Sequence, residues 1–186
     1  MTRSVRILSV AVLAILLGAC AAVKSGKSPI PEVEGKTVHT QLNFWVLEGE
    51  HETTNYHMGS MIPVNAEVRI VDTTGTTITG EVVDNGRRFA IINVAEYSKE
   101  DIEGIYNRYF DGSPRDLGRF RAAEQEAIKA GEIEKGMSKD AVLVARGYPP
   151  AHRTASTEMN SWRYWKGRHN TMVVRFENGR VASITE

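Results

Sequence analysis

Apolar and polar residues alternate strictly between residues 37 and 47 of the chain. A period of two predicts a strand with one buried face. The residues expected on the buried face are Val38, Leu42, Phe44 and Val46.

Further β-rich segments follow at residues 67–72, 77–83 and 87–94. Asn85-Gly86 separates the last two segments and is typical of a hairpin turn, because both residues tolerate a positive φ. Residues 36–95 are therefore expected to form a small antiparallel β-rich domain, for which an SH3-like barrel is one candidate.

The apolar pattern changes to a helical period after residue 95. Ser98, followed by Asp101 three residues later, resembles a capping box and predicts a connecting helix within residues 96–114. Ser113-Pro114 predicts the start of the next helix, since proline is favoured at the first helical position. Gly131 is expected to end that helix.

A short helix is predicted at residues 139–146, with Ser138 as its N-cap and Gly147 as its left-handed stop. A helix of about two turns is marginal alone, because its nucleation is costly. Neighbouring parts of the chain must therefore hold it in place.

The last part of the chain predicts three short strands joined by two turns, an antiparallel meander. One side of the short helix, with Val142 and Ala145, is expected to pack on this sheet through Met172, Val174 and Phe176. The predicted fold class is α+β, with a β-rich domain followed by helices packed on a three-stranded antiparallel sheet.

The chain begins with MTRSVRILSVAVLAILLGAC, in which a basic start precedes an apolar run and small residues. This layout predicts a secretory signal peptide at residues 1–19. Cys20 is the only cysteine, and Leu17-Gly18-Ala19-Cys20 resembles the lipobox of bacterial lipoproteins. The resemblance implies a lipid anchor on Cys20, a flexible tether at residues 20–35 and, with Ala21 next, attachment to the outer membrane.

Charge argues against nucleic acid as a partner. Two of the 23 basic residues, Arg3 and Arg6, lie in the predicted signal peptide, which leaves 21 basic against 23 acidic residues. Binding to nucleic acid requires a basic surface.

Residues 115–186 carry a second resemblance, which rests on a set of residues in a fixed order. They are Gly136, Met137, Ser138, Val142, Gly147, Pro149, Trp162, Phe176, Asn178, Gly179 and Val181. In the order and spacing of these residues, the region is similar to the SmpA/OmlA, or BamE-like, family of outer-membrane lipoproteins. The family implies a periplasm-facing, non-catalytic accessory in the assembly of β-barrel proteins, with no cofactor. The alternative is a periplasmic binding or inhibitor-like protein that recognises a soluble enzyme or a cell-wall component, because secreted β-lactamase inhibitors resemble this shape.

Three residues are candidates for contact with a partner protein. Arg146 stands where the family usually has leucine, so either its stem covers apolar surface with the charge in water or its charge meets a partner. In SWRYW, alternation places Trp162 and Tyr164 on one face and Arg163 and Trp165 on the other. Arg163 and Trp165 are of residue types common in binding hot spots.

HETTNYH, residues 51–57, raises the question of a metal site. A zinc protease needs His-Glu-x-x-His, whereas here the second histidine comes six residues after the first. We interpret the segment as a solvated loop between strands, with a metal-dependent enzyme as a third alternative. No nucleophile elbow or phosphate-binding loop occurs in the sequence, so no catalytic residue is assigned.

Overall fold

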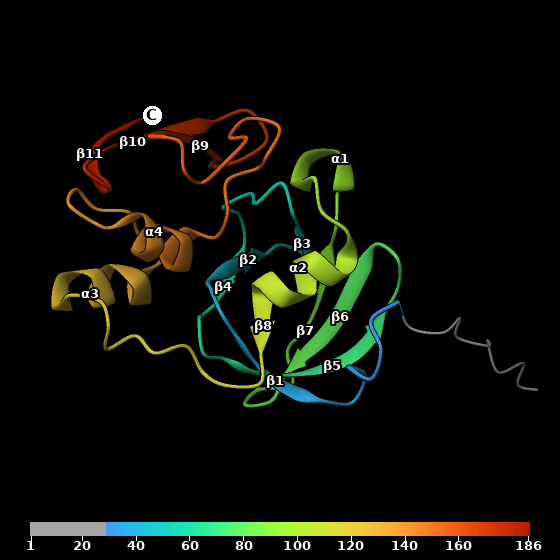
Figure 1. Ribbon diagram of the computed structural model, residues 1–186. Helices are drawn as coiled ribbons and strands as arrows, with labels where there is room; N and C mark the ends of the chain where they lie inside the picture. The colour runs from blue at the N-terminus through green and yellow to red at the C-terminus, as the bar shows by residue number, and fades with distance from the viewer. Residues whose placement is uncertain (1–28) are drawn as a thin grey trace, which may run out of the picture.

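The computed structural model describes residues 29–186 of the chain. Their fold is of the predicted α+β class (Figure 1). The helices are α1 (Ala95–Ser98), α2 (Ile102–Tyr109), α3 (Ala122–Ala130) and α4 (Lys139–Arg146). The strands are β1 (Thr37–Thr40), β2 (Phe44–Val46), β3 (Glu50–Glu52), β4 (Ser60–Ile62), β5 (Glu67–Thr73), β6 (Thr77–Val82), β7 (Arg88–Ile92), β8 (Phe110–Asp111), β9 (Ser161–Trp165), β10 (Thr171–Glu177) and β11 (Arg180–Thr185).

A six-stranded sheet in the order β3-β7-β6-β5-β1-β8 forms the main sheet of residues 30–111, which we call the first unit. The pairs within it are antiparallel except for β3 and β7, which run parallel. The sheet is open, with β3 and β8 as its edges, so its strands do not close into the barrel considered above. The predicted hairpin between β6 and β7 is confirmed. Its loop is longer than two residues, and Gly86 is the loop residue with a positive φ, +67°.

The strand predicted between residues 37 and 47 is divided in two. Its apolar positions are buried as expected, but β1 belongs to the six-stranded sheet and β2 pairs with β4 in a separate two-stranded sheet. The break falls at Asn43, whose backbone N–H donates to Val144 O in α4 (2.9 Å) instead of to a neighbouring strand.

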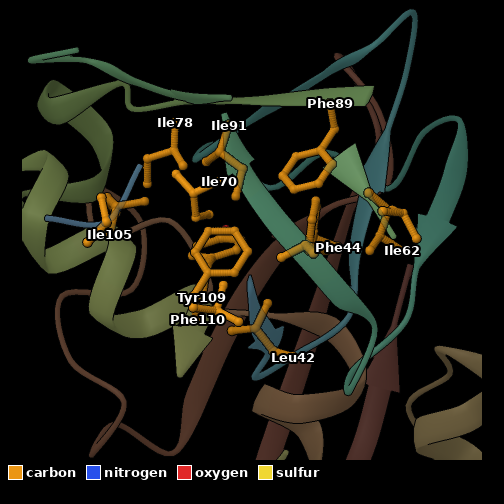
Figure 2. Packing of buried hydrophobic residues seen from close by; sticks show 14 of the residues in the cluster. Leu42, Phe44, Ile62, Ile70, Ile78, Phe89, Ile91, Ile105, Tyr109 and Phe110 are labelled. Atoms are coloured by element: carbon orange, nitrogen blue, oxygen red, sulfur yellow. The ribbon is translucent and has the colours of Figure 1, made fainter. Parts of the chain in front are cut away.

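Aromatic rings fill the centre of the first unit, where Phe44 meets Phe89 and Tyr109 edge-on (Figure 2). The ring centroids lie 5.4 and 5.6 Å apart. Ile102 and Ile105 of α2 belong to the same core. The helix predicted as a connector therefore packs on the sheet and forms part of the first unit.

The helical segment at residues 95–109 differs from the predicted connecting helix in its N-terminal cap. It is divided into α1 and α2, and Asp101 caps α2 by accepting a hydrogen bond from Gly104 N (2.8 Å). Ser98 is the last residue of α1 and takes no part in that cap.

The predicted tether, residues 20–35, ends earlier than its boundary. Ile30 and Val33 are buried in the core of the first unit, and Gly35 N donates to Ile70 O (2.8 Å). Two apolar side chains seated against a sheet hold this segment in place. The predicted signal peptide and Cys20 lie outside the described residues.

The helix expected to start at Pro114 begins eight residues later, at Ala122. Side chains hold the preceding backbone in turns, because Asp111 and Asp116 each accept from an N–H two residues ahead (both 2.8 Å). Such local bonds compete with helix formation. Gly131 ends α3 in the left-handed conformation, as predicted.

Residues 115–186 form the second unit, in which the predicted antiparallel meander is confirmed in the order β11-β10-β9. Asn178 and Gly179 both have positive φ in the turn between β10 and β11. Helix α4 lies beneath the sheet, with α3 beside it (Figure 1). Ser138 caps α4 by accepting from Ala141 N (3.3 Å), and Gly147, with φ +77°, ends it. The residues predicted to join α4 to the sheet share one core, namely Val142, Ala145, Met172, Val174 and Phe176.

Candidate functional site at the junction of the two units

The last turn of α4 is held by two asparagines of the first unit. Asn43 N donates to Val144 O (2.9 Å), and Asn43 Nδ2 donates to Ala145 O (3.1 Å). Asn55 Nδ2 donates to Arg146 O (2.8 Å). The final carbonyls of a helix have no partner within the helix. The first unit supplies these partners, which explains how so short a helix is kept in place.

Asn43 also binds α3 and its own unit. Its Nδ2 donates to Ile128 O (2.6 Å), and its Oδ1 accepts from Val64 N (2.7 Å). The residue has no exposed surface. One amide side chain therefore satisfies three backbone groups that are shielded from water.

Arg146 lies inside this junction and is not on the surface. It is 6 % exposed, its Nη1 donates to Gly131 O (3.1 Å), and its guanidinium carbon lies 5.6 Å from the centre of a Trp45 ring. Burial lowers the pKa of its side chain to about 10. Arg146 is therefore largely buried and lies beside a cavity, away from the exposed protein surface.

Trp45 and His57 pack closely beside Arg146, with ring centroids 3.4 Å apart. Burial, followed by the charge of Arg146, lowers the pKa of His57 to about 2, so the imidazole is neutral. A Cβ at Gly131 would lie 2.7 Å from the Trp45 ring. The end of α3 therefore contacts this tryptophan at a position that only glycine fits, since its φ is also +71°.

His51 contradicts the interpretation of residues 51–57 as a solvated loop. It is 2 % exposed on β3, and Thr53, Thr54 and Asn55 beyond it are also buried. Trp45 O can only accept, so His51 Nδ1 donates to it (2.9 Å) and Nε2 accepts from the Tyr109 hydroxyl (2.9 Å). Burial lowers the pKa of His51 to about 4.

Both ring nitrogens of His51 are thus already hydrogen-bonded within the first unit. Residues 29–186 contain no group of three or more His, Cys, Asp or Glu side chains suited to hold a metal ion.

The outer face of β9 carries the two other candidate residues. The predicted alternation is confirmed, since Trp162 and Tyr164 are buried and Arg163 is exposed. Trp165 is half-buried, because Tyr56 packs edge-on against it with ring centroids 6.5 Å apart. Arg163 and Trp165 share this face, whereas Arg146 is separate from it.

Two cavities flank the pair formed by Trp45 and His57. The larger, of about 430 Å³, is lined by Trp45, Tyr56 and a group of glutamates on and before β3. The smaller, of about 330 Å³, is lined by His57 and Arg146 together with residues of the second unit. The junction thus places one buried cation beside a cavity of ligand size.

The sequence did not identify Asn43 and Asn55 as functional. Asn43 stands on the polar side of an alternating strand, where an asparagine is usually solvated. Its side-chain partners in α3 and α4 lie 85 and 102 residues away along the chain. No local pattern reveals a contact across such a distance.

Comparison with protein-family models, with curated proteins and with solved structures finds no match. Within residues 29–186, every helix is too short or too polar to cross a bilayer.

Proposed function

We propose that the protein is an outer-membrane lipoprotein, anchored by lipid on Cys20, that faces the periplasm and acts without catalysis in envelope assembly. Its role would be that of an accessory subunit that assists insertion of β-barrel proteins through protein contacts. One observation carries the proposal. The second unit packs two helices and a three-stranded meander in the order that the BamE-like resemblance implies.

The packing of the two units supports a scaffold role. Asn43 and Asn55 of the first unit hydrogen-bond to the end of α4, so the two units are joined directly. Two joined units present two different outer surfaces, which suits a subunit that bridges other proteins.

The outer face of β9 is the proposed partner surface. Arg163 is exposed and makes no side-chain hydrogen bond or ion pair within the described part of the chain, and Trp165 is half-exposed beside it. Val173 of β10 lies directly opposite Arg163 in the sheet. An arginine and a tryptophan on one face are residue types that are enriched in binding hot spots.

Replacing Cys20 by serine is expected to release the protein from membranes. A thioether-linked lipid cannot form on serine, and no helix of residues 29–186 replaces it as an anchor. The measurement is the distribution of the full-length protein between membrane and soluble fractions of bacterial cells. Unchanged membrane attachment of Cys20→Ser would remove the lipoprotein proposal.

In-cell crosslinking followed by mass spectrometry tests the partner surface. We expect components of the barrel-assembly machinery among the crosslinked proteins and a loss of at least half of this yield in Arg163→Ala and Trp165→Ala. The matched control is Arg88→Ala on β7, whose side chain is 74 % exposed and pairs with Glu81. Recovery of only a soluble enzyme or wall fragments would favour the binding-protein alternative. Equal crosslinking yields from the wild type and all variants would exclude the outer face of β9 as the partner surface.

A further inference from the structure

Arg146 is a buried charge with no carboxylate in direct contact within residues 29–186, and Glu132 and Glu186 favour its charged form only from a distance. Its guanidinium donates one hydrogen bond, from Nη1 to Gly131 O, and Nε has no partner in the described part of the chain. No carboxylate of residues 29–186 forms an ion pair with it, although only 6 % of the residue is exposed. Buried charges in proteins are normally paired, because an isolated ion is costly to remove from water. Because Nε is enclosed by protein and Nη1 is used, Nη2 is the donor of Arg146 that remains for an anion.

A cavity of about 330 Å³ adjoins Arg146. Lys166 stands on its wall as a second cation, and the His57 ring forms another part of the wall, with its Nε2 enclosed by protein. Another part of the wall is apolar and consists of Ile133, Met172 and Ile184. The cavity thus combines donors for a negative group with a surface for a hydrocarbon body.

The two acidic residues of the cavity favour the charge of Arg146 from a distance, but neither accepts a hydrogen bond from its guanidinium. Glu186 forms its ion pair with Lys166 (2.6 Å), and both side chains are largely or partly exposed. Glu132 forms neither a hydrogen bond nor an ion pair with the guanidinium within residues 29–186. The Glu186 carboxylate is therefore already bound to Lys166, and an incoming anion would compete with it for this cation.

We propose that this cavity binds an organic carboxylate with an apolar body. The carboxylate lies against the Arg146 guanidinium, with Lys166 as the second cation, and the body lies against Ile133, Met172 and Ile184. The planar guanidinium matches a carboxylate in shape and charge. A phosphate dianion fits less well, because it would bring more negative charge near Glu132 and Glu186. Two kinds of ligand carry a carboxylate next to an apolar body: a free organic acid and the carboxyl-terminal residue of a peptide.

The test is a titration of the detergent-purified protein followed by NMR at the indole N–H of Trp45 and the Nε–H of Arg146. One probe is hexanoate, and the other is the N-acetylated tripeptide acetyl-Gly-Gly-Leu. Each probe has its own amide, hexanamide or the amide of the acetylated tripeptide, as a neutral control of the same shape. We expect saturable shifts with at least one acid and binding weaker by about tenfold or more for its amide, since the amide cannot form a hydrogen bond between two charged groups.

Binding by hexanoate alone assigns the site to small acids, and binding by the tripeptide alone assigns it to peptide termini. Either result supports the proposal. The absence of saturable shifts with both acids, or equal affinity for acid and amide, overturns it.

Variants separate the roles of the charges. Arg146→Gln is expected to weaken binding about tenfold or more by the same reasoning. Because Arg146 is buried, Lys166→Gln provides a second, more exposed variant, with an expected loss of about threefold. Glu186→Gln removes the competing carboxylate and is expected to tighten binding by about threefold. The matched control is Arg168→Gln, an exposed cation that lines the other cavity. An equal effect of Arg168→Gln and Lys166→Gln would contradict a specific site.

Discussion

Asn43→Ala is expected to lower the free energy of unfolding by about 4 kcal/mol, because it leaves two buried backbone groups unpaired at about 1–3 kcal/mol each. The groups are Ala145 O and Val64 N, which the Asn43 amide contacts at 3.1 and 2.7 Å. The third partner, Ile128 O (2.6 Å), still accepts from Gly131 N (3.1 Å). The loss falls where the two units meet, so it weakens α3, α4 and the segment that follows β4 together. The measurement is urea unfolding of both proteins under the same conditions.

The matched control for this prediction is Asn170→Ala, which removes an exposed amide from the turn between β9 and β10. Exposed substitutions of this kind usually change stability by less than about 0.5 kcal/mol. If Asn43→Ala lowered the free energy of unfolding as little as the control does, water or other groups would have replaced the amide. That result would contradict the role of Asn43 in joining the two units.

Glu124→Gln is expected to lower the free energy of unfolding at pH 7 by about 3 kcal/mol. Glu124 lies in the first turn of α3, with only 4 % of its side chain exposed. Its Oε1 accepts from Ser138 N (2.7 Å) at the start of α4 and pairs with Arg180 of β11 (3.4 Å). Its Oε2 accepts from the backbone and side chain of Arg121 (3.1 and 3.3 Å). One carboxylate therefore joins both helices and the sheet.

The pH dependence of this effect follows from the pKa of Glu124. Burial alone would raise it, but the hydrogen bonds from Arg121 and Ser138 outweigh burial and lower the pKa from 4.5 to about 2. The unfolded chain therefore takes up a proton at a higher pH than the folded chain does. The stabilisation is complete above pH 4.5 and is lost as pH falls from about 4.5 towards 2.

We therefore expect the stability difference between wild type and Glu124→Gln to shrink across this pH range in urea unfolding. His51 and His57, whose pKa values are lowered to about 4 and 2, also destabilise the fold in acid because only the unfolded chain is protonated below pH 6.5. Both proteins share this loss, so it cancels in the comparison. A difference that stays constant down to pH 2.5 would exclude the carboxylate as its source.

The sequence correctly predicts features that depend only on a few neighbouring residues. The apolar alternation of residues 37–47, the Asn178-Gly179 turn, the Ser138 cap and the three-strand meander are present as predicted. Pro114 shows the limit of such patterns. Proline is compatible with the start of a helix, but nearby aspartates and Asn65, which accepts from Arg115 N (2.6 Å), hold this backbone in turns.

Local sequence patterns do not predict the candidate site. From the sequence, Arg146 was assigned a position in contact with water or a partner, and His51 was placed in a solvated loop. Both are buried because segments far apart in the chain cover them. Their burial depends on which surfaces meet, and periodicity along one segment carries no information about its neighbour.

The sequence by itself determined the α+β class, the turn positions and the buried faces of individual elements, because spacing and backbone preference act over a few residues. Only the tertiary structure decided that Asn43 and Asn55 close α4, that Glu124 joins three elements and that Arg146 has donors without a partner. The physical reason is that the energy of a polar group depends on whether water or protein surrounds it, and folding sets that environment through contacts across 85 to 102 residues.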